Sequence, residues 1–168
     1  MKLRLMGAFL AAATLSGTAQ AQQRPKLYLG ADLSYVNEVE DCGAVFRKGG
    51  RKVDPFELFA LAGANIVRVR IWNDATWTRY SNLTDVKKTI ARSKAAGMHV
   101  LLDFHYSDDW ADGEKQLIPK AWVGLTKEQQ ARALYKYTLD ILTALDRDGL
   151  MPEMVQVGNE TNSELAGS

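Results

Sequence analysis

Residues 65–72 read NIVRVRIW, a run in which apolar residues alternate with Arg68 and Arg70. Alternate residues of a strand point to opposite faces, so one face of this run is apolar and the other carries both arginines. A doubly wound parallel sheet is covered by helices on both sides and favours apolar residues on both faces. In a barrel, one face packs on helices and the other lines the interior. The alternation therefore favours a barrel.

Three other stretches resemble this one in their apolar character. They are residues 27–33 (LYLGADL), 98–106 (MHVLLDFHY) and 154–158 (MVQVG). In residues 98–106, Asp103 and His105 again alternate with apolar neighbours. Strands that alternate with helix-like segments predict βα units and a parallel sheet. A (β/α)₈ TIM barrel takes about 250 residues and eight strands. We therefore expect an α/β fold in which this chain supplies about the first four βα units.

The segments between these runs carry helix boundaries. Residues 54–57 (DPFE) offer a capping aspartate and a proline at the first helical position, and Gly63 suits the end of that helix. A second helix is expected from about Thr84 to Gly97. Residues 126–129 (TKEQ) form a capping-box pattern that opens a third helix, which runs to about Asp148.

Residues 1–21 have the pattern of a secretory signal peptide. Lys2 and Arg4 precede an apolar run, and Ala19-Gln20-Ala21 offers a small-residue cleavage site. The apolar run is shorter than the roughly 20 residues of a membrane span. We expect cleavage after Ala21, a secreted or periplasmic protein, and a domain formed by residues 22–168. We expect that domain to be the amino-terminal half of a (β/α)₈ catalytic domain.

The composition argues against several classes of partner. The chain has 21 basic and 20 acidic residues, and loss of the signal peptide changes the net charge to about −1. Near neutrality predicts neither a nucleic acid nor a membrane partner. Cys42 is the single cysteine in the sequence and has no partner for an internal disulfide. The spacing of cysteines and histidines predicts no metal site.

The candidate site lies at the carboxyl ends of the expected strands, where barrel enzymes place their chemistry. Carboxylates, amides and aromatic rings gather there, which favours a carbohydrate substrate. The strand ends and the loops that follow them contribute Asp32, Arg70, Trp72, Asn73, Asp103, His105, Tyr106, Asn159, Glu160, Trp77, Tyr80, Asp108, Asp109, Trp110 and Trp122. Glycoside hydrolysis needs two carboxyl groups, and Glu160 is the candidate acid.

Each of these candidates also has a structural interpretation. Glu160 could be a solvated glutamate at a strand end. Asp103 and His105 could form a buried hydrogen-bonded pair that only shapes the pocket. The two arginines could neutralise interior carboxylates, and Trp72 and Trp110 could be core residues rather than sugar-stacking ones.

Four long stretches resemble the endo-β-1,4-galactanases, family 53 of the glycoside hydrolases, which belong to a clan of retaining (β/α)₈ enzymes. They are residues 29–34 (LGADLS), 65–73 (NIVRVRIWN), 101–112 (LLDFHYSDDWAD) and 154–160 (MVQVGNE). One difference lies at residues 113–116, which read GEKQ where the family usually has PGKQ.

The resemblance implies roles for individual residues. Glu160 would be the acid/base, and Asn159 the neighbour that contacts the sugar. Arg68 would lie beside the nucleophile, and Asp103, His105 and Trp110 in the substrate cleft. We assign Asp32 and Trp72 to the same cleft. The family's nucleophile, a glutamate at strand seven, is absent from residues 1–168.

The expected function is therefore endo-hydrolysis of β-1,4-galactan with retention, and the polypeptide of residues 1–168 is expected to be inactive alone. The resemblance implies no cofactor, and any structural calcium would belong to later loops beyond Ser168. One alternative is another retaining hydrolase, such as a mannanase or xylanase. The other is a non-catalytic half-barrel that binds carbohydrate.

Overall fold

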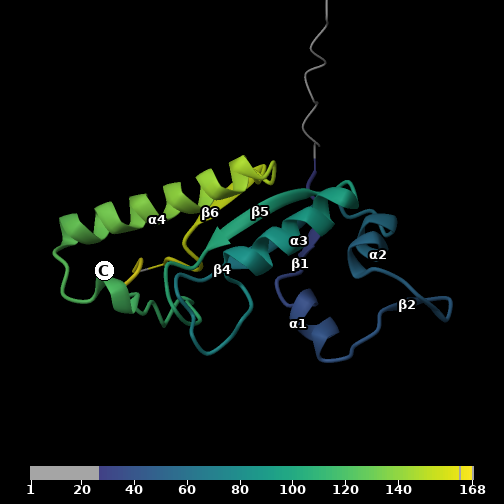
Figure 1. Ribbon diagram of the computed structural model, residues 1–168, viewed down its shortest axis with the longest axis horizontal. Helices are drawn as coiled ribbons and strands as arrows, with labels where there is room; N and C mark the ends of the chain where they lie inside the picture. The colour runs from purple at the N-terminus through teal and green to yellow at the C-terminus, as the bar shows by residue number, and fades with distance from the viewer. Residues whose placement is uncertain (1–26, 163, 168) are drawn as a thin grey trace, which may run out of the picture.

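The computed structural model describes residues 27–162 and 164–167, and a four-stranded parallel sheet forms its centre (Figure 1). Its strands are β1 (Gly30–Asp32), β4 (Ile66–Ile71), β5 (His99–Phe104) and β6 (Met154–Val157). They lie side by side in chain order, and every neighbouring pair is parallel. When neighbouring parallel strands follow one another in chain order, all the crossover connections lie on the same face of the sheet, as in a barrel. In a doubly wound sheet the strand order reverses part-way across the sheet. The prediction of a partial (β/α)₈ barrel is confirmed.

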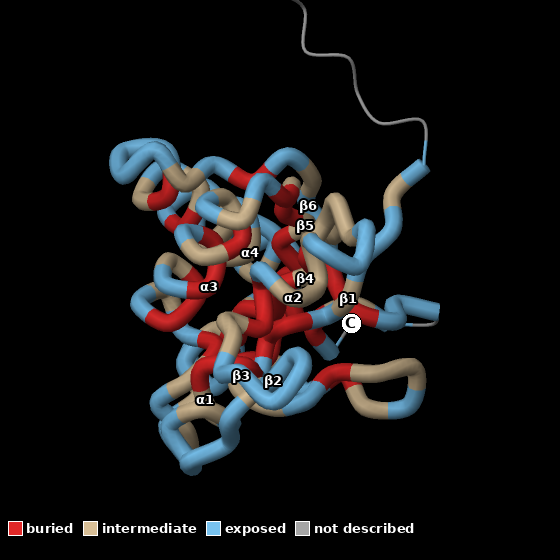
Figure 2. Tube along the Cα trace, turned by 90° about the vertical axis from the view of Figure 1, so that its right-hand side faces the viewer, coloured by how far each residue is buried: buried red, intermediate tan, exposed pale blue. Residues whose placement is uncertain are grey.

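The two faces of the sheet differ as the alternation predicts. Val67, Val69 and Ile71 of β4 are buried in a core that includes Leu102 and Phe104 of β5. Helices complete this core on the outer face: α2 (Pro55–Leu61), α3 (Leu83–Ala95) and α4 (Lys127–Arg147). Figure 2 shows the buried residues running through β4 and β5, with exposed segments around them. The opposite, inner face carries the charged side chains.

The helices begin close to where their capping residues predict. The Asp54 side chain accepts a hydrogen bond of 2.8 Å from the Phe56 amide at the start of α2, and Gly63 beyond its end has a φ of 100°. Thr126 and Gln129 form the predicted capping box of α4. Helix α3 begins at Leu83, slightly before the predicted Thr84, because Asn82 is its capping residue.

Three short elements were not predicted from the sequence. They are helix α1 (Val36–Asp41), the hairpin of β2 (Arg47–Lys48) and β3 (Arg51–Lys52), and the 3₁₀ turn η1 (Lys120–Trp122). The hairpin has exposed residues throughout, so it lacks the apolar alternation that identifies a strand. Its turn uses Gly49 and Gly50, with φ of 56° and 79°. Two successive positive φ values require such glycines.

The described sheet has two open edges, because β1 and β6 each pair with one neighbour only. On the outer face of β6, Val155 and Val157 are 37% and 58% exposed.

Cys42 is an exposed free thiol. Among residues 27–162 and 164–167, no helix has both the length and the apolar character to cross a membrane. The predicted signal peptide lies outside the described residues.

Candidate functional site

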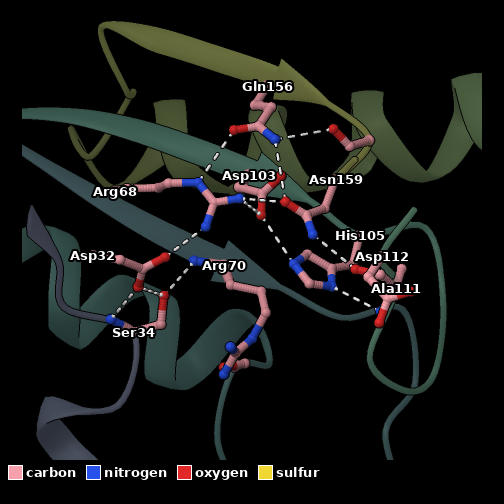
Figure 3. Close-up of polar contacts among 12 residues, drawn as sticks. Asp32, Ser34, Arg68, Arg70, Asp103, His105, Ala111, Asp112, Gln156 and Asn159 are labelled. Carbon is pink, nitrogen blue, oxygen red and sulfur yellow. Dashed lines mark hydrogen bonds and ion pairs between the residues drawn. The ribbon is translucent and has the colours of Figure 1, made fainter. Parts of the chain in front are cut away.

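The inner face of the sheet holds a polar network centred on the guanidinium of Arg68 (Figure 3). This group donates to Asp32 from one nitrogen and to both Asp103 and Asn159 from another, each at 2.6 Å. Its Nε also donates to Gln156 at 3.1 Å. These partners come from β1, β5, β6 and the turn after β6. A single side chain thus ties together all four strands at the end where active sites of barrels lie.

Asp103 and His105 form a buried pair at the end of β5. The His105 Nε2 lies 3.0 Å from Asp103 Oδ2, and the two side chains are 1% and 0% exposed. The Ala111 amide donates to His105 Nδ1 at 3.4 Å, so that nitrogen is an acceptor and the ring proton lies on Nε2. This burial favours the interpretation that the pair shapes the pocket rather than contacting a sugar directly.

Asn159 is fixed on several sides and so places the residue that follows it. Its amide nitrogen donates to the Ala111 carbonyl at 2.7 Å, while its own carbonyl accepts from Gln116 at 2.7 Å. The next residue, Glu160, is exposed, and its Oε2 accepts from the Gly113 amide at 3.3 Å. Gly113 stands where the resembling family usually has proline, which has no amide hydrogen to donate. The loop after β5 therefore contacts both Asn159 and Glu160.

Backbone strain is found at the ends of two neighbouring strands. Glu160 follows β6 with a φ of 49°, and Tyr106 follows β5 with a φ of 48°. Residues other than glycine rarely adopt such values, and each costs of order 1–3 kcal/mol. Strain of this kind concentrates at functional sites, where the surrounding structure maintains it. This supports Glu160 as more than a solvated glutamate at a strand end.

Arg70 lies on the same face of β4 but has different surroundings from those of Arg68. Its guanidinium carbon is 4.4 Å from the ring centre of Tyr35, 4.2 Å from that of Trp72 and 5.1 Å from that of Trp110. It donates to Ser81 Oγ at 3.1 Å and is 2% exposed. No carboxylate among the described residues forms an ion pair with it. Arg68 neutralises interior carboxylates, whereas Arg70 is enclosed by aromatic rings.

The two tryptophans expected at the site differ in exposure. Trp72 is 3% exposed and lies between Arg70 and Trp77, which favours the core interpretation for this residue. Trp110 is 38% exposed, and its ring lies 5.4 Å from that of His105. Of the two rings, the Trp110 ring is the one available to a ligand.

The Asp32 carboxyl of this network has a lowered pKa. Burial acts to raise the pKa of Asp32, but hydrogen bonds from the Ser34 hydroxyl and amide, at 2.6 and 3.0 Å, and from Arg68 lower it below its ordinary value. Asp32 is therefore an anion that helps to hold Arg68. No cluster of three or more histidine, cysteine, aspartate or glutamate side chains in the described part of the chain is arranged to bind a metal ion.

Sequence reasoning did not identify Gln156, Ser34, Tyr35 or Gln116 as parts of the site. Gln156 did carry a signal, because it is the polar residue within the apolar run of residues 154–158. The other three lie in segments without strand alternation, and only the folded arrangement brings them to the network.

Comparisons with known proteins agree with this geometry. The model of glycosyl hydrolase family 53 matches residues 28–168. An arabinogalactan endo-beta-1,4-galactanase of Cellvibrio japonicus (strain Ueda107) is 56% identical over 167 residues, which cover 98% of this chain and 44% of the relative. An endo-beta-1,4-galactanase of Bacillus subtilis (strain 168) is 45% identical over 82% of this chain and 34% of its own length.

Solved structures give the same result. A structure described as one of two fungal beta-1,4-galactanases superposes with a TM-score of 0.78 at 35% identity, over 82% of this chain and 41% of that one. The catalytic domain of an Ignisphaera aggregans protein, described as GH53, superposes with a TM-score of 0.76 at 34% identity and covers 81% and 40%. The chain thus spans less than half the length of these relatives.

The lowered pKa of Asp32 predicts a dependence of stability on pH. The test protein is residues 22–168 joined to the remaining carboxyl-terminal part of the Cellvibrio japonicus relative, here called the completed protein. A lowered folded-state pKa stabilises the fold above the unfolded pKa of about 3.9, and this contribution disappears as the pH falls through the folded value. We expect Asp32→Asn to lower Tm at pH 6. We also expect the Tm of the variant to decrease less than that of the parent as the pH falls below about 4. Melting curves of variant and parent that run parallel from pH 6 to pH 3 would contradict this.

The aromatic enclosure of Arg70 predicts a stabilising role. Replacing it by methionine, which has similar length and no charge, should lower the unfolding free energy of the completed protein by about 2–4 kcal/mol, since each desolvated cation–π contact contributes roughly 0.5–2 kcal/mol. Arg70→Lys keeps the charge but not the planar stacking, and should be intermediate. Urea unfolding measures both. A methionine variant as stable as the parent would show that the contacts contribute nothing.

Proposed function

Because the chain belongs to glycosyl hydrolase family 53, we propose that it carries the acid/base half of an endo-β-1,4-galactanase that acts with retention. The supporting observation is the Arg68 network, which joins four strands and fixes the position of Asn159. Asn159 is the residue directly before Glu160 in the sequence. The named activity of the Cellvibrio japonicus and Bacillus subtilis relatives supports galactan as the substrate.

In the proposed mechanism, Glu160 protonates the glycosidic oxygen as the leaving sugar departs. A second carboxylate, supplied from outside residues 1–168, attacks the anomeric carbon and forms a glycosyl-enzyme intermediate. Glu160 then removes a proton from the incoming water, which releases the sugar with its original configuration. The two carboxyl groups supply both proton transfer and nucleophile, so the proposal includes no cofactor.

The other residues of the site are proposed to position the sugar and the neighbouring side chains rather than to transfer protons. Arg68 holds Asn159 at 2.6 Å, and the Asn159 side chain beside the acid is proposed to contact a sugar hydroxyl. Asp103, His105 and Asp32 hold Arg68 and the loop that follows β5. The exposed face of Trp110 is proposed to stack on a sugar ring. Trp72 would act indirectly, through its packing against Arg70 and Trp77.

The substrate is tested with a panel of polysaccharides. The completed protein should release new reducing ends from β-1,4-galactan at least about 100-fold faster than from mannan or xylan, because a site built to bind particular hydroxyls rejects sugars that lack them or carry them in another orientation. Faster release of reducing ends from mannan or xylan would identify the completed protein as another retaining hydrolase, a mannanase or a xylanase. Binding to galactan without release from any polysaccharide would favour the carbohydrate-binding alternative.

Export is a separate part of the proposal. The pattern of residues 1–21 supports transport out of the cytoplasm and cleavage after Ala21. Exported protein should then begin at Gln22. Amino-terminal sequencing that found Met1 retained on the exported protein would contradict this.

A further inference from the structure

A cavity of about 230 Å³ lies beside the candidate site and takes no part in the mechanism proposed for Glu160. The loops after β4 and β5 form it together with the segment that leads into η1. Its lining residues are Thr76, Trp77, Ser107, Asp108, Asp109, Leu117, Ile118 and Lys120. Pockets for drug-sized ligands start at about 300 Å³, so this volume suits a smaller group such as one sugar ring.

Trp77 forms one wall of this cavity, and its side chain is exposed to solvent but held in place by a hydrogen bond and a ring contact. The side chain is 62% exposed. Its Nε1 nevertheless donates to the Asp108 carbonyl at 3.1 Å, and its ring lies 4.8 Å from that of Trp72. A large aromatic surface left in water but held in one orientation is typical of a binding surface rather than of packing.

Asp108 holds the walls of the cavity together. Its carboxylate accepts from the Asp74 amide at 2.9 Å and from the Lys120 amide at 2.8 Å, while its carbonyl accepts from Trp77. These three bonds join three separate segments of chain. Because the walls are already ordered, a ligand would not have to order them on binding, and such preorganisation favours affinity.

Asp109 connects the cavity to the candidate site. The Lys115 ammonium at 2.7 Å lowers the pKa of the Asp109 carboxyl, which therefore stays an anion that can accept hydrogen bonds from hydroxyl groups. The next residue is Trp110, whose ring lies against His105. A polysaccharide that lies over Trp110 could therefore continue into the cavity.

We infer that this cavity is a further sugar-binding subsite, which takes one β-linked galactosyl unit of the polysaccharide with Trp77 as its platform. The axial C4–O4 bond of a galactosyl unit leaves the C–H groups at C3, C4 and C5 on one apolar face, and that face matches the exposed indole. Asp109 accepts hydrogen bonds from hydroxyls at the edge of the ring. The inference rests on the proposed function for the identity of the sugar.

The test measures binding by calorimetry in the completed protein carrying Glu160→Gln, which prevents cleavage. Dissociation constants are compared for β-1,4-linked galactotriose and galactohexaose in three proteins: the Glu160→Gln parent, a Trp77→Ala variant and a Tyr135→Ala control. Tyr135 is a 68% exposed aromatic residue on α4. The longer chain should bind more tightly to the parent and to the control. Trp77→Ala should weaken hexasaccharide binding about five- to twentyfold and remove most of that advantage.

An unchanged ratio of the two dissociation constants in Trp77→Ala would overturn the subsite, because an equal loss for both sugars indicates a structural effect only. A parent without preference for the longer chain would also overturn it. Trp77→Phe keeps an aromatic face and should retain part of the preference, and circular dichroism checks that each variant is folded. Failure of the proposed function is seen separately, as a completed protein with an intact Glu160 that does not hydrolyse galactan.

Discussion

Replacing Glu160 by glutamine should lower turnover of β-1,4-galactan by the completed protein about 10²- to 10⁴-fold, which is the usual contribution of a general acid–base group. Glutamine has the same shape and can still accept the Gly113 hydrogen bond, but it has no proton to give to the leaving oxygen. The loss should appear in kcat rather than in KM, because the missing interaction belongs to the transition state. Reducing ends released from galactan measure it.

Glu164→Gln is the matched control. It makes the same chemical change at another exposed residue of the same terminal segment, four positions beyond Glu160. We expect it to keep turnover within about twofold, since surface substitutions away from special features have small effects. Equal losses in the two variants would mean that the segment is sensitive to any change of charge and that Glu160 has no special role.

A polypeptide of residues 22–168 produced alone should hydrolyse galactan at least about 10⁴-fold more slowly than the completed protein. Glu160 can still donate a proton, but no covalent intermediate forms without the second carboxylate, and loss of one member of a catalytic unit costs several orders of magnitude. The open edges at β1 and β6 and the exposed Val155 and Val157 also favour self-association. Size-exclusion chromatography accompanies the activity measurement.

Comparable turnover by the short polypeptide would contradict this prediction, provided that its Glu160→Gln variant is inactive and so excludes a contaminating enzyme. The nucleophile would then have to lie among the aspartates of the site. Asp32 and Asp103 are both bound to Arg68, and Asp108 accepts two backbone amides. Asp109 is paired with Lys115. These contacts leave no free carboxylate beside Glu160 in this set.

The features that local sequence determines were predicted well. The alternation around Arg68 and Arg70 identified a strand with one helix-facing side, because the period of a strand depends only on neighbouring residues. Asp54 and Thr126 marked helix starts because a cap acts within three residues. The hairpin at Gly49 and Gly50 was missed because its exposed strands have no apolar face to produce a pattern.

The site could be predicted as a set of residues but not as a set of contacts. Strand ends indicated Asp32, Asp103 and Asn159, yet their common partner Arg68 was assigned through a family resemblance. The enclosure of Arg70 could not be foreseen, because Tyr35 lies in a segment without periodicity and meets Arg70 only after folding. Exposure also decided between the alternatives for Trp72 and Trp110, and no local pattern contains that information.

The most direct test of Glu160 as the acid/base is chemical rescue of a Glu160→Ala variant of the completed protein. The substrate is an aryl β-galactobioside with a good leaving group, which needs no acid to depart, so the glycosyl-enzyme intermediate forms and then waits for a base. Azide attacks that intermediate without needing a base. We predict that azide raises turnover at least about tenfold and yields the β-configured galactobiosyl azide. An α-configured azide would instead assign Glu160 as the nucleophile, and an alanine variant that hydrolyses galactan like the parent would contradict any catalytic role.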